Sequence, residues 1–128
     1  MQKDFDVWNK RKKIIDGEKR NPDFHEREIW WCAIGVNVGS EQHSQTSDYS
    51  RPVVIVKKFT RDVFWAIPLT TKIKDGIPFR IRFTLEDMIN DILVLQMRIF
   101  DSKRLIRKVG VMPKEDFVAL INYIKEFL

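Results

Sequence analysis

The sequence is poor in cysteine and histidine, and it has no long apolar run. Its one cysteine, Cys32, excludes an internal disulfide and a zinc site built from several cysteines. Its two histidines, His25 and His43, have no ligand-like spacing with Cys32 or with carboxylates. A helix that crosses a bilayer needs roughly 20 apolar residues in a row, and the sequence has no such run. We therefore expect no metal, no cofactor and no membrane partner.

The N-terminus lacks the apolar core of a secretory signal, because charged residues alternate through it. The sequence also lacks the dense basic tail with which some proteins bind nucleic acid by charge alone. Lys and Arg number 23 against 18 Asp and Glu, which gives a net charge of +5. This moderate excess suits a partner with a phosphate backbone, but many other proteins share it. Together with the single cysteine, these features predict a reduced, cytoplasmic location.

The chain does contain enough apolar material for a core. Of its 128 residues, 44% are hydrophobic, including nine Phe and four Trp. One domain of ordinary size is the simplest organisation. A helical extension is expected in front of it, over residues 1–24, because Phe5, Trp8 and Ile15 recur at helical spacing. This helix is either a solvated element with Trp8 docked on the domain or an arm that follows phosphates.

The remainder of the chain, residues 25–128, is predicted to consist mainly of strands. Branched and aromatic residues indicate the strands, and polar segments separate them. The expected strands cover residues 29–36, 52–59, 63–69, 79–83, 92–98 and 106–111. Residues 85–90 are expected to form a short irregular or helical link, and residues 101–105 a capped helical turn.

Two prolines complete the fold prediction. Pro52 lacks an N–H, so its strand is expected to begin at a sheet edge or at a bulge. Pro113 opens a C-terminal helix. The apolar stripe that packs this helix on the sheet consists of Phe117, Leu120, Ile121, Ile124 and Leu128. The expected fold is mainly β (α+β): a twisted, mainly antiparallel barrel-like sheet with this C-terminal helix and the N-terminal helical extension.

Polar side chains stand at the ends of two neighbouring strands. Arg51 precedes the second expected strand, and Thr70 and Thr71 follow the third. If these strands pair as a hairpin, the three side chains meet at one end of the same sheet. An arginine fork and hydroxyl groups at that end can bind a phosphodiester. Arg51 could instead form an ion pair with Glu41 or Asp48, and the threonines could be ordinary strand-end residues.

Seven short motifs follow one another in order along the chain. They occupy residues 28–31, 39–42, 51–55, 68–72, 77–79, 96–101 and 103–105. Each motif is weak alone, but their order resembles that of the MazF/PemK toxins of type II toxin–antitoxin systems. The resemblance covers about residues 27–128. It departs from the family in three places: a longer loop at 43–50, Leu95 in place of an acidic residue before Gln96, and the helix before Arg27.

The resemblance implies a small Src-homology-like β-barrel of the CcdB/PemK/MazF toxin type that forms a homodimer. It implies a metal-independent endoribonuclease that cleaves single-stranded mRNA at short sequences. The substrate's 2′-OH attacks the phosphodiester and leaves a 2′,3′-cyclic phosphate. A cognate antitoxin is the implied protein partner. Two alternatives stay open: a non-catalytic toxin that poisons a topoisomerase, as the CcdB toxins do, or a decayed module that only binds RNA or antitoxin.

The matching motifs also imply roles for individual residues. Arg51 and Thr70 take the places of the family's catalytic arginine and threonine. Glu41 lies in the loop before that arginine and is the nearest candidate for a general base, with His43 as a second candidate. The residues expected to contact RNA are Ser40, Gln42, His43, Thr71, Lys72, Gln96 and Arg98. The last two could instead be buried groups with satisfied hydrogen bonds.

Overall fold

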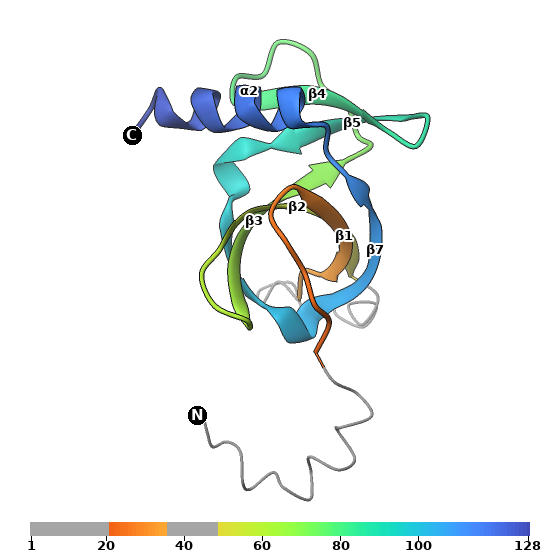
Figure 1. Ribbon diagram of the computed structural model, residues 1–128. Coiled ribbons are helices and arrows are strands. Elements are labelled where there is room, and N and C mark those ends of the chain that lie inside the picture. The colour runs from red at the N-terminus through yellow and green to blue at the C-terminus, as the bar shows by residue number, and fades with distance from the viewer. Residues whose placement is uncertain (1–20, 36–48) are drawn as a thin grey trace, which may run out of the picture.

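The computed structural model describes residues 21–35 and 49–128 of the chain (Figure 1). The helix expected over residues 1–24 lies almost entirely outside the described residues. The same holds for most of the polar loop that precedes Arg51. The boundary between a helical extension and the following domain therefore stays a prediction.

The described residues form an antiparallel sheet followed by a helix. The elements are β1 (Glu28–Ala33), β2 (Ser50–Lys58), β3 (Val63–Thr70), β4 (Arg80–Leu85), β5 (Met88–Leu93), η2 (Val94–Gln96), β6 (Arg98–Asp101), η3 (Ser102–Arg104), β7 (Leu105–Val111) and α2 (Lys114–Lys125). The strand order is β4-β5-β3-β2-β1-β7, with β6 paired to β3. In Figure 1, β1, β2, β3 and β7 curl around a common axis, and α2 lies with the β4–β5 hairpin at one end of the curl. This confirms the predicted barrel-like fold with a C-terminal helix.

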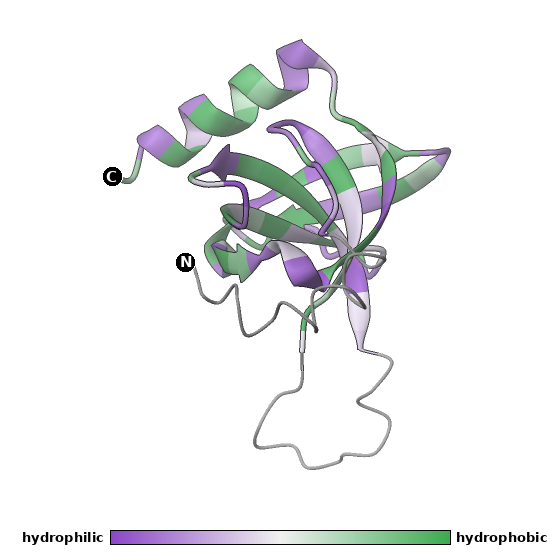
Figure 2. Ribbon diagram, turned by 60° about the horizontal axis from the view of Figure 1, so that its bottom comes forward, coloured by the Kyte–Doolittle hydropathy of each residue, from purple (hydrophilic) through white to green (hydrophobic). Residues whose placement is uncertain are grey.

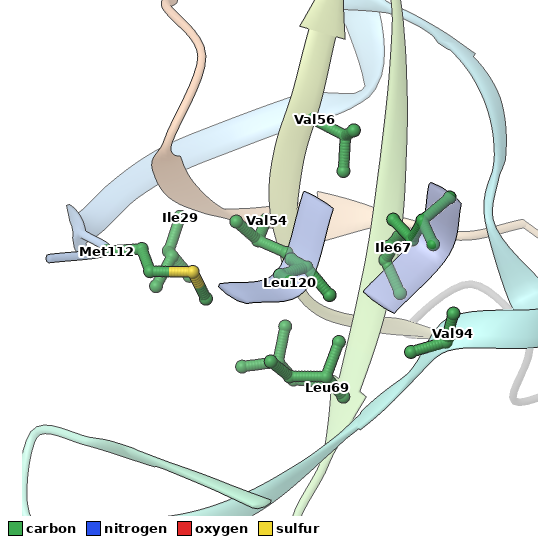
Figure 3. Close-up of a cluster of buried hydrophobic side chains, with 10 residues drawn as sticks. Ile29, Val54, Val56, Ile67, Leu69, Val94, Met112 and Leu120 are labelled. Carbon is green, nitrogen blue, oxygen red and sulfur yellow. The ribbon is translucent and has the colours of Figure 1, made fainter. Parts of the chain in front are cut away.

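Strand β2 is apolar on both faces because it separates two hydrophobic clusters. Val53 and Ile55 belong to the cluster inside the curl. Val54 and Val56 belong to the second cluster, which also contains Leu120 of α2 (Figure 3). Successive side chains of a strand point to opposite faces, so a strand with both faces covered has a continuous apolar run. The continuous apolar run from which β2 was predicted is therefore explained by the burial of both faces of the strand.

Helix α2 packs on the sheet through one side, as predicted. Leu120 and Ile124 are buried, whereas hydrophilic residues alternate with hydrophobic ones along the helix (Figure 2). The prediction that Leu128 belongs to the packed stripe is wrong, because the helix ends at Lys125 and Leu128 is 90% exposed. Among the described residues, no helix has the length and apolar character needed to span a membrane.

Residues 85–90 belong to a β-hairpin, so the expected irregular or helical link is wrong. Strands β4 and β5 pair along their whole length. Glu86 and Asp87 connect them, with φ angles of 51° and 67°. Positive φ at both central residues is the pattern of a type I′ turn, which usually contains Asn or Gly. Glu86 and Asp87 are neither Asn nor Gly, so the sequence did not indicate this turn.

The single strand expected over residues 92–98 is also wrong. Strand β5 ends at Leu93, the short helix η2 follows, and β6 begins at Arg98. The break lets the chain pair twice with β3, because β5 pairs with one end of β3 and β6 with the other.

Strand β2 as a whole runs between β1 and β3. The pairing of β2 with β3 begins at Val53, however, and Pro52 pairs only with Trp31 of β1. A proline is tolerated here because it lies just beyond the ladder between β2 and β3.

Candidate functional site

The structure brings Arg51 and Thr70 to the same end of the sheet. Strands β2 and β3 pair with Val53 opposite Pro68 and Val54 opposite Ile67. Arg51 comes two residues before Val53 and Thr70 two residues after Pro68, so both lie just beyond the same end of this ladder. Both side chains are half-buried and line one groove with a volume of about 390 Å³. The geometry expected of a hairpin is therefore present.

The guanidinium of Arg51 faces this groove beside an aromatic ring. Its Nη2 lies 3.5 Å from the hydroxyl oxygen of Tyr49, and its central carbon lies 5.8 Å from the centre of the Tyr49 ring. No carboxylate among the described residues forms an ion pair with it. The alternative partners Glu41 and Asp48 lie outside the described residues. Within the described part of the chain, the guanidinium fork keeps donors for an anionic ligand.

The hydroxyl of Thr70 organises the chain that follows β3. Its Oγ1 accepts a hydrogen bond of 3.1 Å from the backbone N–H of Lys72. A hydroxyl has one donor and two acceptor positions, so its O–H remains available to donate. Thr71 and Lys72 are exposed and line the same groove. Three of the residues expected at the site are thus grouped around Arg51.

A buried carboxylate holds the segment after Thr70 in place. The side chain of Asp91 is 1% exposed and lies 2.8 Å from both Arg80 Nη1 and Arg82 Nε. It also accepts a hydrogen bond of 3.1 Å from the backbone N–H of Lys74. Arg80 Nη1 in turn donates to the carbonyl oxygen of Lys72 at 3.1 Å. The network ties the loop that carries Lys72 to the β4–β5 hairpin.

The carboxyl of Asp91 stays ionised in this network. Burial raises its pKa, but hydrogen bonds from Arg82, Lys74 and Arg80 outweigh burial, so the pKa lies below its ordinary value. In β5, Asp91 is the residue paired with Thr70 of β3. The carboxylate of Asp91 bonds to two arginines and to a backbone N–H. It is therefore suited to hold the site together and not to exchange protons with a ligand.

Gln96 and Arg98 are not part of the groove that contains Arg51. They line a separate recess of about 310 Å³ with Ile34, Pro68 and Phe100. Both side chains are exposed, so the alternative that they are buried and satisfied is wrong. Arg98 Nη2 donates to the carbonyl oxygen of Ile34 at 2.9 Å. Arg98 therefore supports the end of the chain segment that follows β1.

The remaining predicted site residues cannot be placed. Ser40, Glu41, Gln42 and His43 lie outside the described residues, so their roles stay predictions. Within residues 21–35 and 49–128, no cluster of His, Cys, Asp or Glu side chains could hold a metal ion.

The groove is also lined by residues that the sequence did not single out as site residues, among them Trp31, Asn90 and Arg107. The central carbon of the Arg107 guanidinium lies 5.9 Å from the centre of the Trp31 ring, and the two residues pair across β1 and β7. Asn90 is 2% exposed, and its Nδ2 donates to the carbonyl oxygen of Met88 at 3.2 Å. The apolar run around Trp31 predicts that every residue in it is buried. Nothing in the sequence therefore indicated that Trp31 lines a groove.

The groove is open, basic and partly apolar. Arg51, Lys72 and Arg107 supply positive charge, and Glu86 at the hairpin supplies one carboxylate. Trp31 and neighbouring apolar side chains provide surfaces on which flat groups can stack. The fold and this groove define a small β-barrel protein with a cleft suited to an anionic, partly aromatic ligand.

The comparisons with known proteins assign this barrel to a family. The model of the PemK-like, MazF-like toxins of type II toxin–antitoxin systems matches residues 25–128, and the chain belongs to that family. The crystal structure of MazF from Deinococcus radiodurans is similar in fold, with a TM-score of 0.58 and 16% sequence identity. That similarity covers 84% of this chain and 96% of the MazF chain. No curated protein sequence matches the chain. The resemblance found in the sequence is thereby confirmed.

Proposed function

We propose that this toxin is a metal-independent endoribonuclease that cleaves single-stranded mRNA at short sequences. The observation that carries the proposal is that Arg51 and Thr70 line the same basic groove of a PemK-like, MazF-like toxin. Phosphodiester cleavage of this kind requires that the reacting groups be positioned and that the negative charge on the phosphate be stabilised. An arginine and a threonine can supply both effects.

The proposed reaction uses the nucleophile that RNA itself carries. The 2′-oxygen attacks the adjacent phosphorus and loses its proton, while the bond from phosphorus to the 5′-oxygen breaks. The 5′-oxygen leaves with a proton, so the products are a 2′,3′-cyclic phosphate and a free 5′-hydroxyl. Arg51 binds the phosphate oxygens as negative charge develops on them. Thr70 donates its O–H to a phosphate oxygen or to the 2′-oxygen.

The proton that leaves the 2′-oxygen requires a base. Glu41 is the proposed base and His43 is the second candidate. General base catalysis contributes about 10²–10⁴-fold, so a site that lacked it would be slow. The proposed RNA contacts of the neighbouring loop are Ser40, Gln42 and His43.

The proposed RNA contacts that lie among the described residues divide between two places. Thr71 and Lys72 lie in the groove, where Lys72 adds charge for a phosphate beside the cleaved one. Gln96 and Arg98 line the separate recess, so we assign them to nucleotides further along the strand.

The family also suggests the partners of this toxin. We infer that a cognate antitoxin covers the groove and that two copies of the chain form a homodimer, both in the cytoplasm. A sedimentation experiment at micromolar concentration tests the dimer, and a monomer would contradict it.

Incubation of the purified protein with a mixture of RNAs in EDTA tests the reaction. We expect fragments with 2′,3′-cyclic phosphate ends, and we expect Arg51→Ala to slow cleavage by at least roughly 100-fold because it removes the charged fork. Arg61→Ala is the matched control, since Arg61 is exposed in the turn between β2 and β3. Cleavage by Arg51→Ala at the wild-type rate would remove Arg51 from its role. Growth arrest with intact RNA and trapped DNA–topoisomerase complexes would replace the proposal with a non-catalytic toxin.

A further inference from the structure

The outer face of the sheet has an exposed apolar patch beside the turn between β2 and β3. It consists of Phe59, Trp65 and Ile99, which are 45%, 37% and 57% exposed, and we call it the turn patch. We propose that the turn patch is the docking surface for the N-terminal segment of the same chain, residues 1–20. That segment lies outside the described residues, and the family match begins after it, at residue 25. None of the three patch residues lines the groove, so the docking is independent of the proposed RNA cleavage.

The three side chains of the turn patch form one continuous surface. The ring centres of Phe59 and Trp65 lie 5.0 Å apart in an edge-to-face arrangement. Ile99 of β6 is paired with Trp65 of β3, and directly paired residues place their side chains on the same face of a sheet. Single exposed apolar residues are ordinary, whereas a contiguous exposed patch marks a surface that contacts something else.

Helix α2 covers another part of the same face. Ile67 and Leu69 of β3 point to the same side as Trp65, because side chains alternate along a strand. Both are buried in the cluster that contains Leu120 of α2. The residues of the turn patch belong to neither of the two hydrophobic clusters. The turn patch is therefore a part of this face that the described chain leaves uncovered.

The N-terminal segment joins the described chain beside the turn patch. Asn21 Nδ2 donates to Asp62 Oδ1 at 3.2 Å, and Asp62 lies in the turn between β2 and β3. From there the chain runs into the barrel, where Phe24 is buried with its ring centre 4.8 Å from that of Phe64. Residue 20 is thus held at the turn where the patch lies.

The anchor at Asp62 is itself fixed, and the patch is within reach of it. The buried Ser102 donates its backbone N–H to the carbonyl oxygen of Asp62 at 2.8 Å, and its Oγ lies 3.4 Å from Asp62 Oδ1. Trp65 follows Asp62 by three residues, about 10 Å along a strand. Ile15 precedes Asn21 by six residues, which span about 9 Å in a helix and at most about 21 Å when extended. Ile15 therefore reaches the turn patch in either conformation.

The segment supplies apolar side chains that suit the turn patch. Phe5, Trp8 and Ile15 recur at helical spacing, so a helix formed on the patch presents them on one side. Aromatic side chains pack well against other aromatic rings in edge-to-face pairs. Docking also holds the basic run of residues 10–13 at this end of β3, whereas Thr70 is at the other end. The segment is thereby assigned to the barrel and not to the RNA groove.

The size of the turn patch favours this occupant over a separate molecule. The exposed parts of its three side chains amount to on the order of 250 Å². A stable interface between two proteins covers about 800 Å² on each partner. A segment of the same chain is present at an effective concentration in the millimolar range, so a smaller contact is sufficient.

Trypsin digestion of the full-length protein tests the docking. The basic run of residues 10–13 provides cleavage sites, and a docked segment is cut only when it opens. We expect Trp65→Ala to accelerate cleavage there roughly 5- to 30-fold, because it removes the largest side chain of the patch. Trp65→Phe keeps an aromatic ring and should retain most of the protection. Mass spectrometry of the fragments measures the rate, and thermal unfolding verifies that each variant is folded.

The matched control compares two exposed isoleucines. Ile99→Ala removes a patch residue that is 57% exposed, whereas Ile106→Ala removes a residue of β7 that is 55% exposed and lies outside the patch. The first variant should accelerate cleavage of the segment, and the second should leave the rate unchanged.

A disulfide trap tests the position of the segment. Lys12 lies in the segment, and Lys57 is an exposed residue of β2 paired with Trp65. With oxidised glutathione, Lys12→Cys/Lys57→Cys should form an intramolecular disulfide, whereas Lys12→Cys/Lys114→Cys, with a cysteine at the start of α2, should not. Cys32 does not compete, because burial raises its pKa to about 12.

Equal trypsin rates for wild type and folded Trp65→Ala overturn the docking, as do equal disulfide yields for the two cysteine pairs. A disulfide between two copies of the chain, or loss of a dimer in Trp65→Ala by sedimentation, assigns the turn patch to a second copy and also overturns it. Faster cleavage in Trp65→Ala and Ile99→Ala, together with the intramolecular disulfide, confirms it.

Discussion

The hydroxyl of Thr70 has one task already and is available for a second. Its oxygen accepts a hydrogen bond from the backbone N–H of Lys72, and Thr70 lines the groove that also contains Arg51. We expect Thr70→Ala to lower the rate constant of RNA cleavage roughly 10²–10³-fold, as loss of one transition-state donor does. Thr70→Ser keeps the O–H and should retain most of the activity.

Single-turnover kinetics with saturating protein measures this effect apart from RNA affinity. Thr84→Ala is the matched control, because Thr84 is an exposed residue of β4 outside the groove. A Thr70→Ala variant with the wild-type rate constant would show that Thr70 only shapes the loop.

The thiol of Cys32 is buried in the cluster inside the curl. Burial raises its pKa to about 12, and the charges of Arg104 and Arg98 offset only part of that rise. At pH 8 almost no thiolate is present, so an alkylating reagent should leave the native protein unlabelled. Mass spectrometry checks this, with the urea-unfolded protein as the reactive control. Equal labelling rates in the two states would contradict the prediction.

At the scale of single elements, Asp91 connects β5 to the loop after β3. We expect Asp91→Asn to lower the free energy of unfolding by about 2 kcal/mol, because it leaves Arg80 half-paired in a site where the carboxylate is 1% exposed. The value is below that of a fully buried pair because Arg82 is 46% exposed and solvent screens its charge.

Urea unfolding measures that loss, and the same arginine provides the control. Asp75 also binds Arg82 at 2.8 Å, but its side chain is 88% exposed. Asp75→Asn should change the free energy of unfolding by less than about 0.5 kcal/mol. Equal effects of Asp91→Asn and Asp75→Asn would show that burial of the carboxylate does not matter.

At the scale of the whole molecule, two buried carboxylates predict acid sensitivity. Burial raises the pKa of Glu28, but hydrogen bonds from Trp30, His25 and Lys108 outweigh it and leave the pKa below its ordinary value. The pKa of Asp91 is lowered in the same way. Such groups stabilise the fold fully above their unfolded pKa values, about 3.9 for Asp and 4.3 for Glu, and lose this as pH falls through the folded values.

We therefore expect the free energy of unfolding to fall as pH drops below about 4. Urea titrations between neutral and acidic pH measure the slope. The variant Glu28→Gln/Asp91→Asn should be less stable at neutral pH and show a flatter dependence. A slope equal to that of wild type would assign the acid sensitivity to other carboxyl groups.

The sequence by itself determined the class of fold and indicated two of the residues that line the groove. Strands β1, β2, β3 and β7 and helix α2 were predictable because their apolar runs differ from the polar segments between them. Arg51 and Thr70 followed from their position at the ends of consecutive strands, since a hairpin pairs the start of one with the end of the next. Local pattern is sufficient where neighbours along the chain decide the structure.

Only the tertiary structure decided the rest of the groove. Trp30 and Trp31 are adjacent and chemically identical, and packing alone buries the first and leaves the second beside Arg107. The hairpin that holds Asn90 turns on two acidic residues without a turn signal. Gln96 lies away from the groove, in the short helix η2 between β5 and β6, and these two strands pair with opposite ends of β3. These outcomes depend on contacts between segments far apart in sequence, which no local pattern contains.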